Sequence, residues 1–170
     1  MKDRQSIIDF IDEKTGGDKS GVYLAFSGGK DSMVLFDAVT RWYPDVPIIH
    51  NPKKETHNLT KKFMYKLSIK NNIYNVPLAN MNKIIEMNGF TTQIDGTRRS
   101  EFTRTEKSND VVIGGVSVSR ENMPDTVVNG LFGINHIYPI IGWEDEDVYN
   151  YIRSYDVDYS MEYVENGELP

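Results

Sequence analysis

The chain has 170 residues, of which 39 % are hydrophobic, and its formal net charge is −6. This length fits one domain with a buried core, and no apolar run reaches the roughly 18 to 20 residues that a membrane-spanning helix needs. The absence of cysteine excludes disulfides, thiolate metal sites and a cysteine nucleophile within these residues. No apolar segment typical of a secretory signal follows Met1–Gln5, so we expect a cytoplasmic protein.

The charge is unevenly distributed along the chain. Residues 52–107 carry eleven Lys and Arg against five Asp and Glu, whereas residues 121–170 carry eleven acidic residues against one basic residue, Arg153. The acidic total argues against a general nucleic-acid binder. The basic middle third can line a site for a small polyanion, although ordinary solvated surface also explains most of its lysines.

Hydrophobic periodicity predicts strands that alternate with helices along the first half of the chain. In chain order we expect a helix over 5–13, a strand over 22–26, a helix over 31–42, a strand over 46–50, a helix from 59 to about 71, a strand over 73–78 and a helix over 81–87. Gly89 ends the last of these helices.

The second half of the chain is less regular. Residues 90–110 are polar and aperiodic, and we interpret them as a long loop. Residues 111–113 are interpreted as a fourth strand, and a closing helix contains Val148 and Tyr155, with acidic residues in its first turn. The pattern predicts a single α/β domain over residues 1–170, with one doubly wound, mainly parallel sheet and helices on both faces. In such sheets ligands bind at the carboxyl ends of the strands.

The segment between the first predicted strand and its helix reads Ser-Gly-Gly-Lys-Asp-Ser. Two adjacent glycines allow a sharp turn that brings backbone N–H groups close to a ligand oxygen. The N-terminus of the following helix adds unpaired N–H donors and partial positive charge, which favour an anion. A tight turn with capping residues is the alternative, but the full segment in this context favours phosphate. The predicted nucleotide-binding residues here are Ser27, Gly28, Gly29, Lys30, Asp31 and Ser32.

Two residues of this segment carry charge. Lys30 is a candidate cation beside the phosphates, and Asp31 either holds Mg²⁺ or caps the helix. The spacing Gly-x-x-x-x-Gly-Lys-Ser/Thr of a Walker A loop is missing, so this is a different kind of phosphate loop.

Residues 27–32 resemble the PP-loop signature of ATP pyrophosphatases, in which the loop holds the pyrophosphate of ATP while the α-phosphate reacts. Residues 138–152, an apolar-Pro-apolar-apolar-x-Trp segment followed by an acidic helix, resemble the phosphoadenosine phosphosulfate (PAPS) reductase family and the small subunit of bacterial ATP sulfurylase. The resemblance covers roughly Val22 to Tyr159. It implies an adenine nucleotide alpha hydrolase-like fold, with ATP or PAPS as ligand and Mg²⁺ as cofactor.

The family usually has Gly-x-Arg-x-x-Glu/Gln-Ser after the fourth strand, with an arginine that contacts the nucleotide's phosphate or sulfate. Spacing to Pro139 aligns residues 115–121 with this motif, and we prefer this alignment. It makes Gly115 a nucleotide-binding residue, although Ser117 replaces the arginine and Arg120 comes three residues late.

The competing alignment places residues 96–101 at this motif, with better identity and worse spacing. In either case Arg98 and Arg99 are candidate clamps, because arginine binds phosphate oxygens bidentately. A disordered basic loop is the alternative interpretation. Glu55 and Thr56 match a Glu-Thr that the family shows after its second strand, although the preceding turn differs.

The missing cysteine is the largest departure from the family, whose reductases resemble one another in a C-terminal cysteine that attacks the sulfate sulfur. We therefore predict an enzyme that binds ATP and Mg²⁺, transfers AMP to an acceptor and releases pyrophosphate. One alternative is a regulator or sink that binds PAPS without reducing it. Another is a subunit whose acidic C-terminal third docks a partner enzyme, as the resemblance to the ATP sulfurylase subunit implies. The predicted catalytic residues are Lys30, Asp31, Arg98, Arg99 and Arg120, with Asp31 as the metal ligand.

Overall fold

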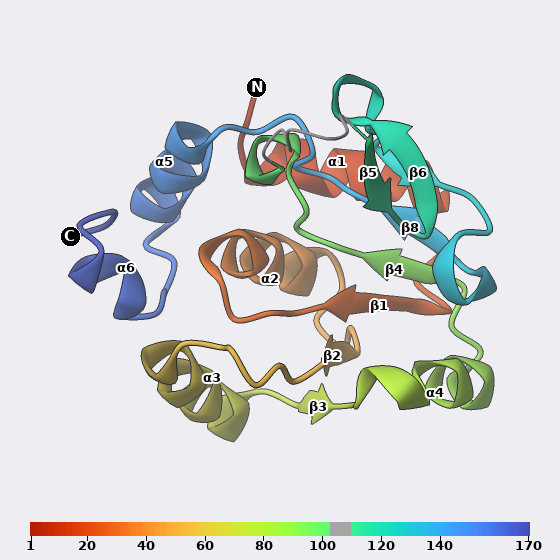
Figure 1. The fold of residues 1–170 in the computed structure, drawn as a ribbon, viewed down its shortest axis with the longest axis horizontal. Coiled ribbons are helices and arrows are strands. Elements are labelled where there is room, and N and C mark those ends of the chain that lie inside the picture. The colour runs from red at the N-terminus through yellow and green to blue at the C-terminus, as the bar shows by residue number, and fades with distance from the viewer. Residues whose placement is uncertain (103–109) are drawn as a thin grey trace.

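A six-stranded sheet forms the centre of the structure, a computed structural model that describes residues 1–102 and 110–170 (Figure 1). Its parallel strands are β1 (Val22–Ala25), β2 (Ile48–His50), β3 (Ile73–Asn75), β4 (Thr92–Ile94) and β8 (Asn135–Ile137), and β7 (Thr126–Val127) runs antiparallel to β8. The strand order is β3-β2-β1-β4-β8-β7. The predicted doubly wound, mainly parallel sheet is confirmed.

The helices agree with the hydrophobic periodicity. They are α1 (Arg4–Thr15), α2 (Lys30–Trp42), α3 (Asn58–Lys70), α4 (Met81–Asn88), α5 (Asp145–Tyr155) and the short α6 (Glu162–Glu165). Gly89 ends α4 in the left-handed conformation, as its position predicts. A capping box between Glu144 and Asp147 begins α5. Among the described residues, none of the helices combines the length and hydropathy needed to cross a bilayer.

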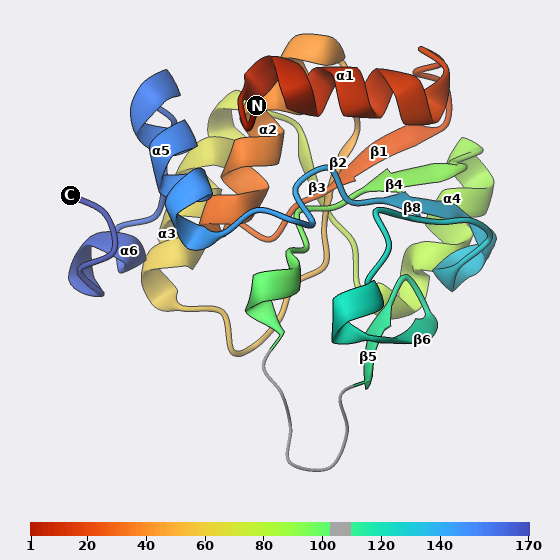
Figure 2. The ribbon, with the colours of Figure 1, turned by 90° about the horizontal axis from the view of Figure 1, so that it is seen from above.

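Alternate residues of the strands point to opposite faces of the sheet and build two layers of core. Val22 and Leu24 of β1 pack in the larger cluster, with residues of α1, α2 and α5. Tyr23, between them, packs in a smaller cluster with Met81 and Ile85 of α4. Figure 2 shows α1 and α4 on opposite sides of the sheet, so the prediction of helices on both faces is confirmed.

The predicted loop over residues 90–110 is wrong in its first part, because β4 lies within it. β4 pairs with β1 on one side and with β8 on the other, at the middle of the sheet. Only three residues form this strand, and two of them, Thr92 and Gln93, are polar. The sequence of β4 therefore shows no hydrophobic pattern. Pairing with β1 and β8 stabilises the strand instead. Residues 103–109 of the predicted loop lie outside the described residues.

The fourth strand predicted at residues 111–113 is a strand, but it is not part of the main sheet. β5 (Asp110–Ile113) pairs antiparallel with β6 (Val116–Ser119) in a separate two-stranded hairpin. Gly114 and Gly115 form its two-residue turn with φ of 56° and 83°. Positive φ at both positions is the geometry that turns a chain back on itself, so the strand returns instead of joining the sheet.

Candidate nucleotide site

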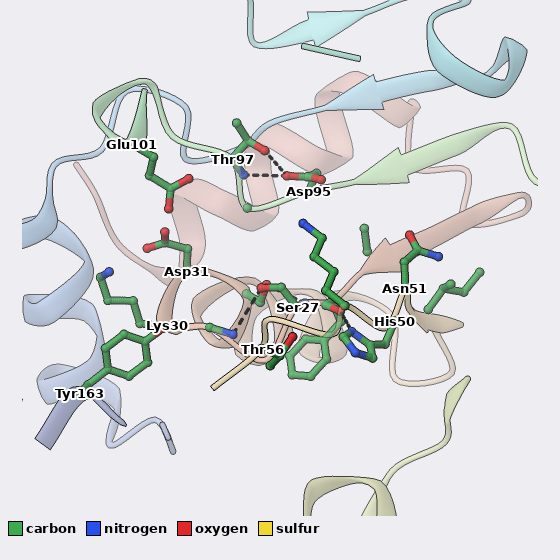
Figure 3. Close-up of a pocket in the computed structure, with 17 residues that line it drawn as sticks. Ser27, Lys30, Asp31, His50, Asn51, Thr56, Asp95, Thr97, Glu101 and Tyr163 are labelled. Carbon is green, nitrogen blue, oxygen red and sulfur yellow. Dashed lines mark hydrogen bonds between the residues drawn. The ribbon is translucent and has the colours of Figure 1, made fainter. Parts of the chain in front are cut away.

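A cavity of about 470 Å³ opens at the carboxyl ends of β1, β2 and β4 (Figure 3). The chain leaves β1 toward β2 on one side, while β4 lies on the other side of β1, so this is where the strand order reverses. Open α/β sheets bind ligands at such a point. The cavity is lined by Ala25, Phe26, Ser27, Gly29, Lys30, Asp31, Ser32, Ile49, His50, Asn51, Lys53, Thr56, Asp95, Gly96, Thr97, Glu101 and Tyr163.

The phosphate loop, residues 27–32, is a closed turn held by its own serines. Ser27 Oγ lies 2.7 Å from Ser32 Oγ, and the Ser27 N–H donates to Ser32 Oγ at 3.1 Å. Gly28 has a φ of 81°, and a Cβ there would lie 2.5 Å from Sδ of Met64 on α3. Only glycine fits this position, because both the backbone conformation and the packed neighbour exclude a side chain.

The first turn of α2 forms the floor of the cavity. Gly29 is the N-cap and makes no side-chain capping bond, and Asp31 lies two residues into the helix. The alternative that Asp31 caps the helix is therefore wrong. The Lys30 N–H donates to the Tyr163 hydroxyl at 3.0 Å. Lys30 Nζ lies 3.8 Å from a carboxylate oxygen of Glu168, so this side chain is paired with the C-terminal segment.

Asp31 and Glu101 bring two carboxyl groups face to face at one wall of the cavity (Figure 3). Asp31 is 8 % exposed, and its Oδ1 is buried without a hydrogen-bond partner, although Arg98 Nε lies 3.0 Å away. Partial burial and the adjacent Asp31 carboxylate raise the pKa of Glu101 to about 8, because both favour the protonated form. The pair therefore holds a proton near neutral pH unless a cation replaces it.

Arg98 lies behind this wall and does not line the cavity. It is 1 % exposed, and its Nη2 donates to Asp145 Oδ1 at 2.8 Å while its Nε contacts Asp31. The guanidinium thus joins the segment after β4 to the start of α2 and to the first turn of α5. Its observed contacts are those of a residue that positions Asp31, and they leave no exposed edge for a phosphate.

The other two predicted arginines also lie away from the cavity. Arg99 Nη2 donates to the Met123 carbonyl at 3.2 Å, and Arg120 Nε donates to the Arg99 carbonyl at 3.4 Å. Gly115 lies in the β5–β6 turn, where a Cβ would contact Leu131. Of the predicted site residues, the structure groups those of the phosphate loop and separates Arg99, Arg120 and Gly115 from them.

The preferred alignment of the family's arginine motif is corrected by the strand order. Residues 96–101 directly follow β4, the fourth parallel strand, whereas residues 115–121 belong to the hairpin and the turn after it. Spacing to Pro139 points to the wrong segment because the β5–β6 hairpin lies between β4 and β8 in the sequence. Gly96 packs against the start of α2, where a Cβ would lie 3.3 Å from the Asp31 carbonyl, so this glycine permits a close approach.

Several cavity residues were not predicted. His50 ends β2 and Asn51 follows it, and Asp95 and Thr97 follow β4. Asp95 Oδ1 accepts hydrogen bonds from the Thr97 N–H at 2.7 Å and from the Thr97 hydroxyl at 2.5 Å. Their position at the end of a parallel strand is the feature that could have identified them. It could be recognised for β2, which the sequence predicts, but not for β4, which it does not. Thr56, matched to the family only by its Glu-Thr pair, lines the cavity, as do Lys53 and Tyr163.

The fold and the phosphate loop define an α/β protein of the PP-loop class. The phosphoadenosine phosphosulfate reductase domain family matches residues 21–165. The chain therefore belongs to this family, within the PP-loop adenine nucleotide alpha hydrolase superfamily. A comparison with curated protein sequences found no match.

Solved structures share the fold at low sequence identity. FMN adenylyltransferase from Candida glabrata is 12 % identical, with a TM-score of 0.68 over 94 % of this chain and 55 % of that one. PAPS reductase from Candida auris is 14 % identical, with a TM-score of 0.63 over 95 % and 84 %. A U34-tRNA thiolase from Methanococcus maripaludis is 10 % identical, with a TM-score of 0.59 over 92 % and 64 %. The chain thus spans about half the length of the adenylyltransferase.

Proposed function

We propose that the cavity binds ATP with Mg²⁺ and that the chain transfers AMP to an acceptor, releasing pyrophosphate. The observation that carries this proposal is the phosphate loop at the carboxyl edge of the sheet. There, two serine hydroxyls and the N-terminus of α2 line a cavity of about 470 Å³, large enough for a nucleotide. The adenylyltransferase fold supports it, because that enzyme has been solved with FMN and the ATP analogue AMPCPP.

Asp31 fits a magnesium ion. Its side chain lines the cavity beside the phosphate loop, with Oδ1 held by Arg98 Nε at 3.0 Å, and carboxylate oxygen is the donor that this hard cation prefers. Within residues 1–102 and 110–170, no group of three or more His, Cys, Asp or Glu side chains could hold a metal. Magnesium usually keeps several waters and takes one or two carboxylates plus substrate phosphates, so Asp31 with the nucleotide meets its needs. When bound, the ion would neutralise charge on the phosphates.

The residues of the chain would act by position and charge. Ser27, Ser32 and the loop N–H groups would hold the pyrophosphate, which orients the α-phosphate toward the acceptor. Arg98 would act through Asp31, whose carboxylate it positions. Lys53 lines the cavity and makes no ion pair with a described residue, so its ammonium group is available to a phosphate. Direct roles for Lys30, Arg99 and Arg120 stay predictions.

A coupled pyrophosphate assay tests the proposal. With ATP and Mg²⁺ we expect slow pyrophosphate release that rises sharply when the right acceptor is supplied, and sulfate, small amines and RNA form the first panel. With PAPS and thioredoxin or glutathione we expect no sulfite, because these residues include no cysteine to attack the sulfur. Sulfite production would contradict the mechanism. Tight PAPS binding without pyrophosphate release from any acceptor would favour a regulator or sink.

We propose that residues 1–170 form one nucleotide-binding domain. The acidic C-terminal third partly pairs within the chain, since Asp147 binds Lys2 and Asp145 binds Arg98. A protein partner at this surface and a cytoplasmic location therefore stay predictions.

A further inference from the structure

A second cavity, of about 340 Å³, adjoins the nucleotide cavity between the loop after β2 and helix α3. His50, Lys53 and Thr56 line both cavities. The two cavities therefore adjoin at these residues, and molecules bound in each would lie beside one another. A two-substrate transfer needs this arrangement, because the reacting atoms must come within contact distance.

The second cavity carries positive charge that the described part of the chain does not neutralise. Lys53 and Lys61 line it, and neither forms an ion pair with a described carboxylate. Lys61 Nζ donates only to the Lys54 carbonyl, at 3.4 Å. Helix α3 has the sequence NLTKKFMYKLSIK, which contains four lysines and no acidic residue. An anionic group is the complement of this wall.

Apolar side chains line the same cavity. Met64 and Tyr65 follow Lys61 at i+3 and i+4 on α3, and Ile73 begins β3. Tyr65 is 70 % exposed. Met64 also packs on the phosphate loop, since its Sδ lies 2.5 Å from where a Cβ of Gly28 would be. The second cavity therefore lies directly behind the loop, and its surface suits the flat apolar body of a ligand whose charged group contacts the lysines.

His50 marks the boundary between the two cavities. Its Nδ1 lies 2.8 Å from the Phe26 carbonyl oxygen, which can only accept, so Nδ1 carries the hydrogen. In the neutral ring Nε2 is then an acceptor. A ligand hydroxyl or amine at the boundary would find this acceptor beside the phosphate loop.

We propose that the second cavity binds the acceptor, and that the acceptor is a small compound with an apolar ring and an anionic group. This inference rests on the proposed adenylyl transfer. It narrows the acceptor to an amphipathic anion, and it assigns the anion to Lys61 and the ring to Met64 and Tyr65.

The test uses three probes on the whole chain saturated with AMPCPP and Mg²⁺: phenyl phosphate, inorganic phosphate and benzyl alcohol. Methyl NMR signals of Met64 and Ile73 report the second cavity. We expect phenyl phosphate to shift both signals and to bind about tenfold more tightly than either of the other probes. Lys61→Met should weaken phenyl phosphate about tenfold, while Lys62→Met should not. Lys62 is the matched control, because it is the exposed neighbour on α3 and does not line the cavity.

The outcomes separate this inference from the proposed function. If AMPCPP binds but phenyl phosphate causes no shift in the signals of Met64 and Ile73, the acceptor site is overturned and the nucleotide proposal stands. Competition between phenyl phosphate and AMPCPP would overturn it as well, because the two would then share one site. Equal effects of the two lysine variants would remove the assigned anion contact. Phenyl phosphate binding without AMPCPP binding would contradict the proposed function and the acceptor role together.

Discussion

Gly28 shows how a single position shapes the phosphate loop. Its φ of 81° and the contact with Met64 both require glycine. Gly28→Ala should weaken ATP binding by about tenfold or more, equivalent to ~1.4 kcal/mol, because the added methyl displaces the loop or α3.

Titration calorimetry of ATP with both forms measures the effect. Gly16→Ala is the matched control, because Gly16 has a φ of 64° and open space around its Cβ, at the end of α1. It should lower stability through backbone strain and leave ATP affinity unchanged. Equal ATP affinity in the Gly28 variant would remove the phosphate assignment of the loop.

Asp31 combines a cavity-facing carboxylate with a buried contact to Arg98. Asp31→Asn should abolish the enhancement of ATP binding by Mg²⁺, because a neutral amide is a poorer ligand for a hard cation. The measurement is the ATP dissociation constant with and without Mg²⁺. Asp45→Asn, at an exposed acid outside this cavity, should keep the enhancement. Unchanged magnesium dependence in the Asp31 variant would leave Asp31 with only its contact to Arg98.

The C-terminal segment lies over the start of α2, and Tyr163 makes the closest contact. Its hydroxyl accepts the Lys30 N–H, one of the donors that a phosphate would use. Tyr163→Phe should therefore strengthen ATP binding by about 2- to 10-fold, the range that one neutral hydrogen bond of about 0.5–1.5 kcal/mol supports.

Calorimetry compares this variant with Tyr159→Phe. The Tyr159 hydroxyl donates to the Pro170 carbonyl in the same segment, away from the cavity lining, so this control should bind ATP like the unmodified chain. Weaker ATP binding in Tyr163→Phe would mean that the hydroxyl contacts the nucleotide instead of competing with it.

Three helices that are distant in the sequence meet at one carboxylate. Asp37 of α2 pairs with Arg4 of α1 at 2.8 Å and accepts a hydrogen bond from Tyr151 of α5 at 2.5 Å. Tyr151 belongs to the larger core cluster, which joins residues of α1, α2 and α5, so we expect the chain to unfold in one cooperative transition.

Asp37→Ala should lower the free energy of unfolding by about 2 kcal/mol, because Arg4 and Tyr151 lose their partner in a largely buried place. The corresponding fall in Tm is about 4–8 °C, measured by circular dichroism. Asp9→Ala removes an exposed contact with Gln5 and should change Tm little. Two separate transitions would contradict the single-domain prediction for residues 1–170.

Local sequence pattern determined much of this fold. β1, the phosphate loop and α2 are consecutive, so an apolar run, two glycines and helical spacing were enough to predict them. The same holds for α4, which ends at Gly89, and for α5 with its acidic first turn. In each case the sequence signal lies within a few residues along the chain, although the core contacts of these elements come from distant segments.

The tertiary structure alone decided the rest of the site. β4 is stabilised by β1 and β8 and not by its own polar residues, so its pattern could not reveal it. The sequence around Arg98 indicates an exposed basic residue. In the structure Asp31 and Asp145, which are far away in the sequence, pair with it. Burial is a property of the neighbours that pack on a side chain, and for these residues the neighbours come from other elements. The sequence by itself therefore determined the phosphate loop, whose residues are consecutive. Which other residues surround the loop was decided by the order of the strands in the sheet.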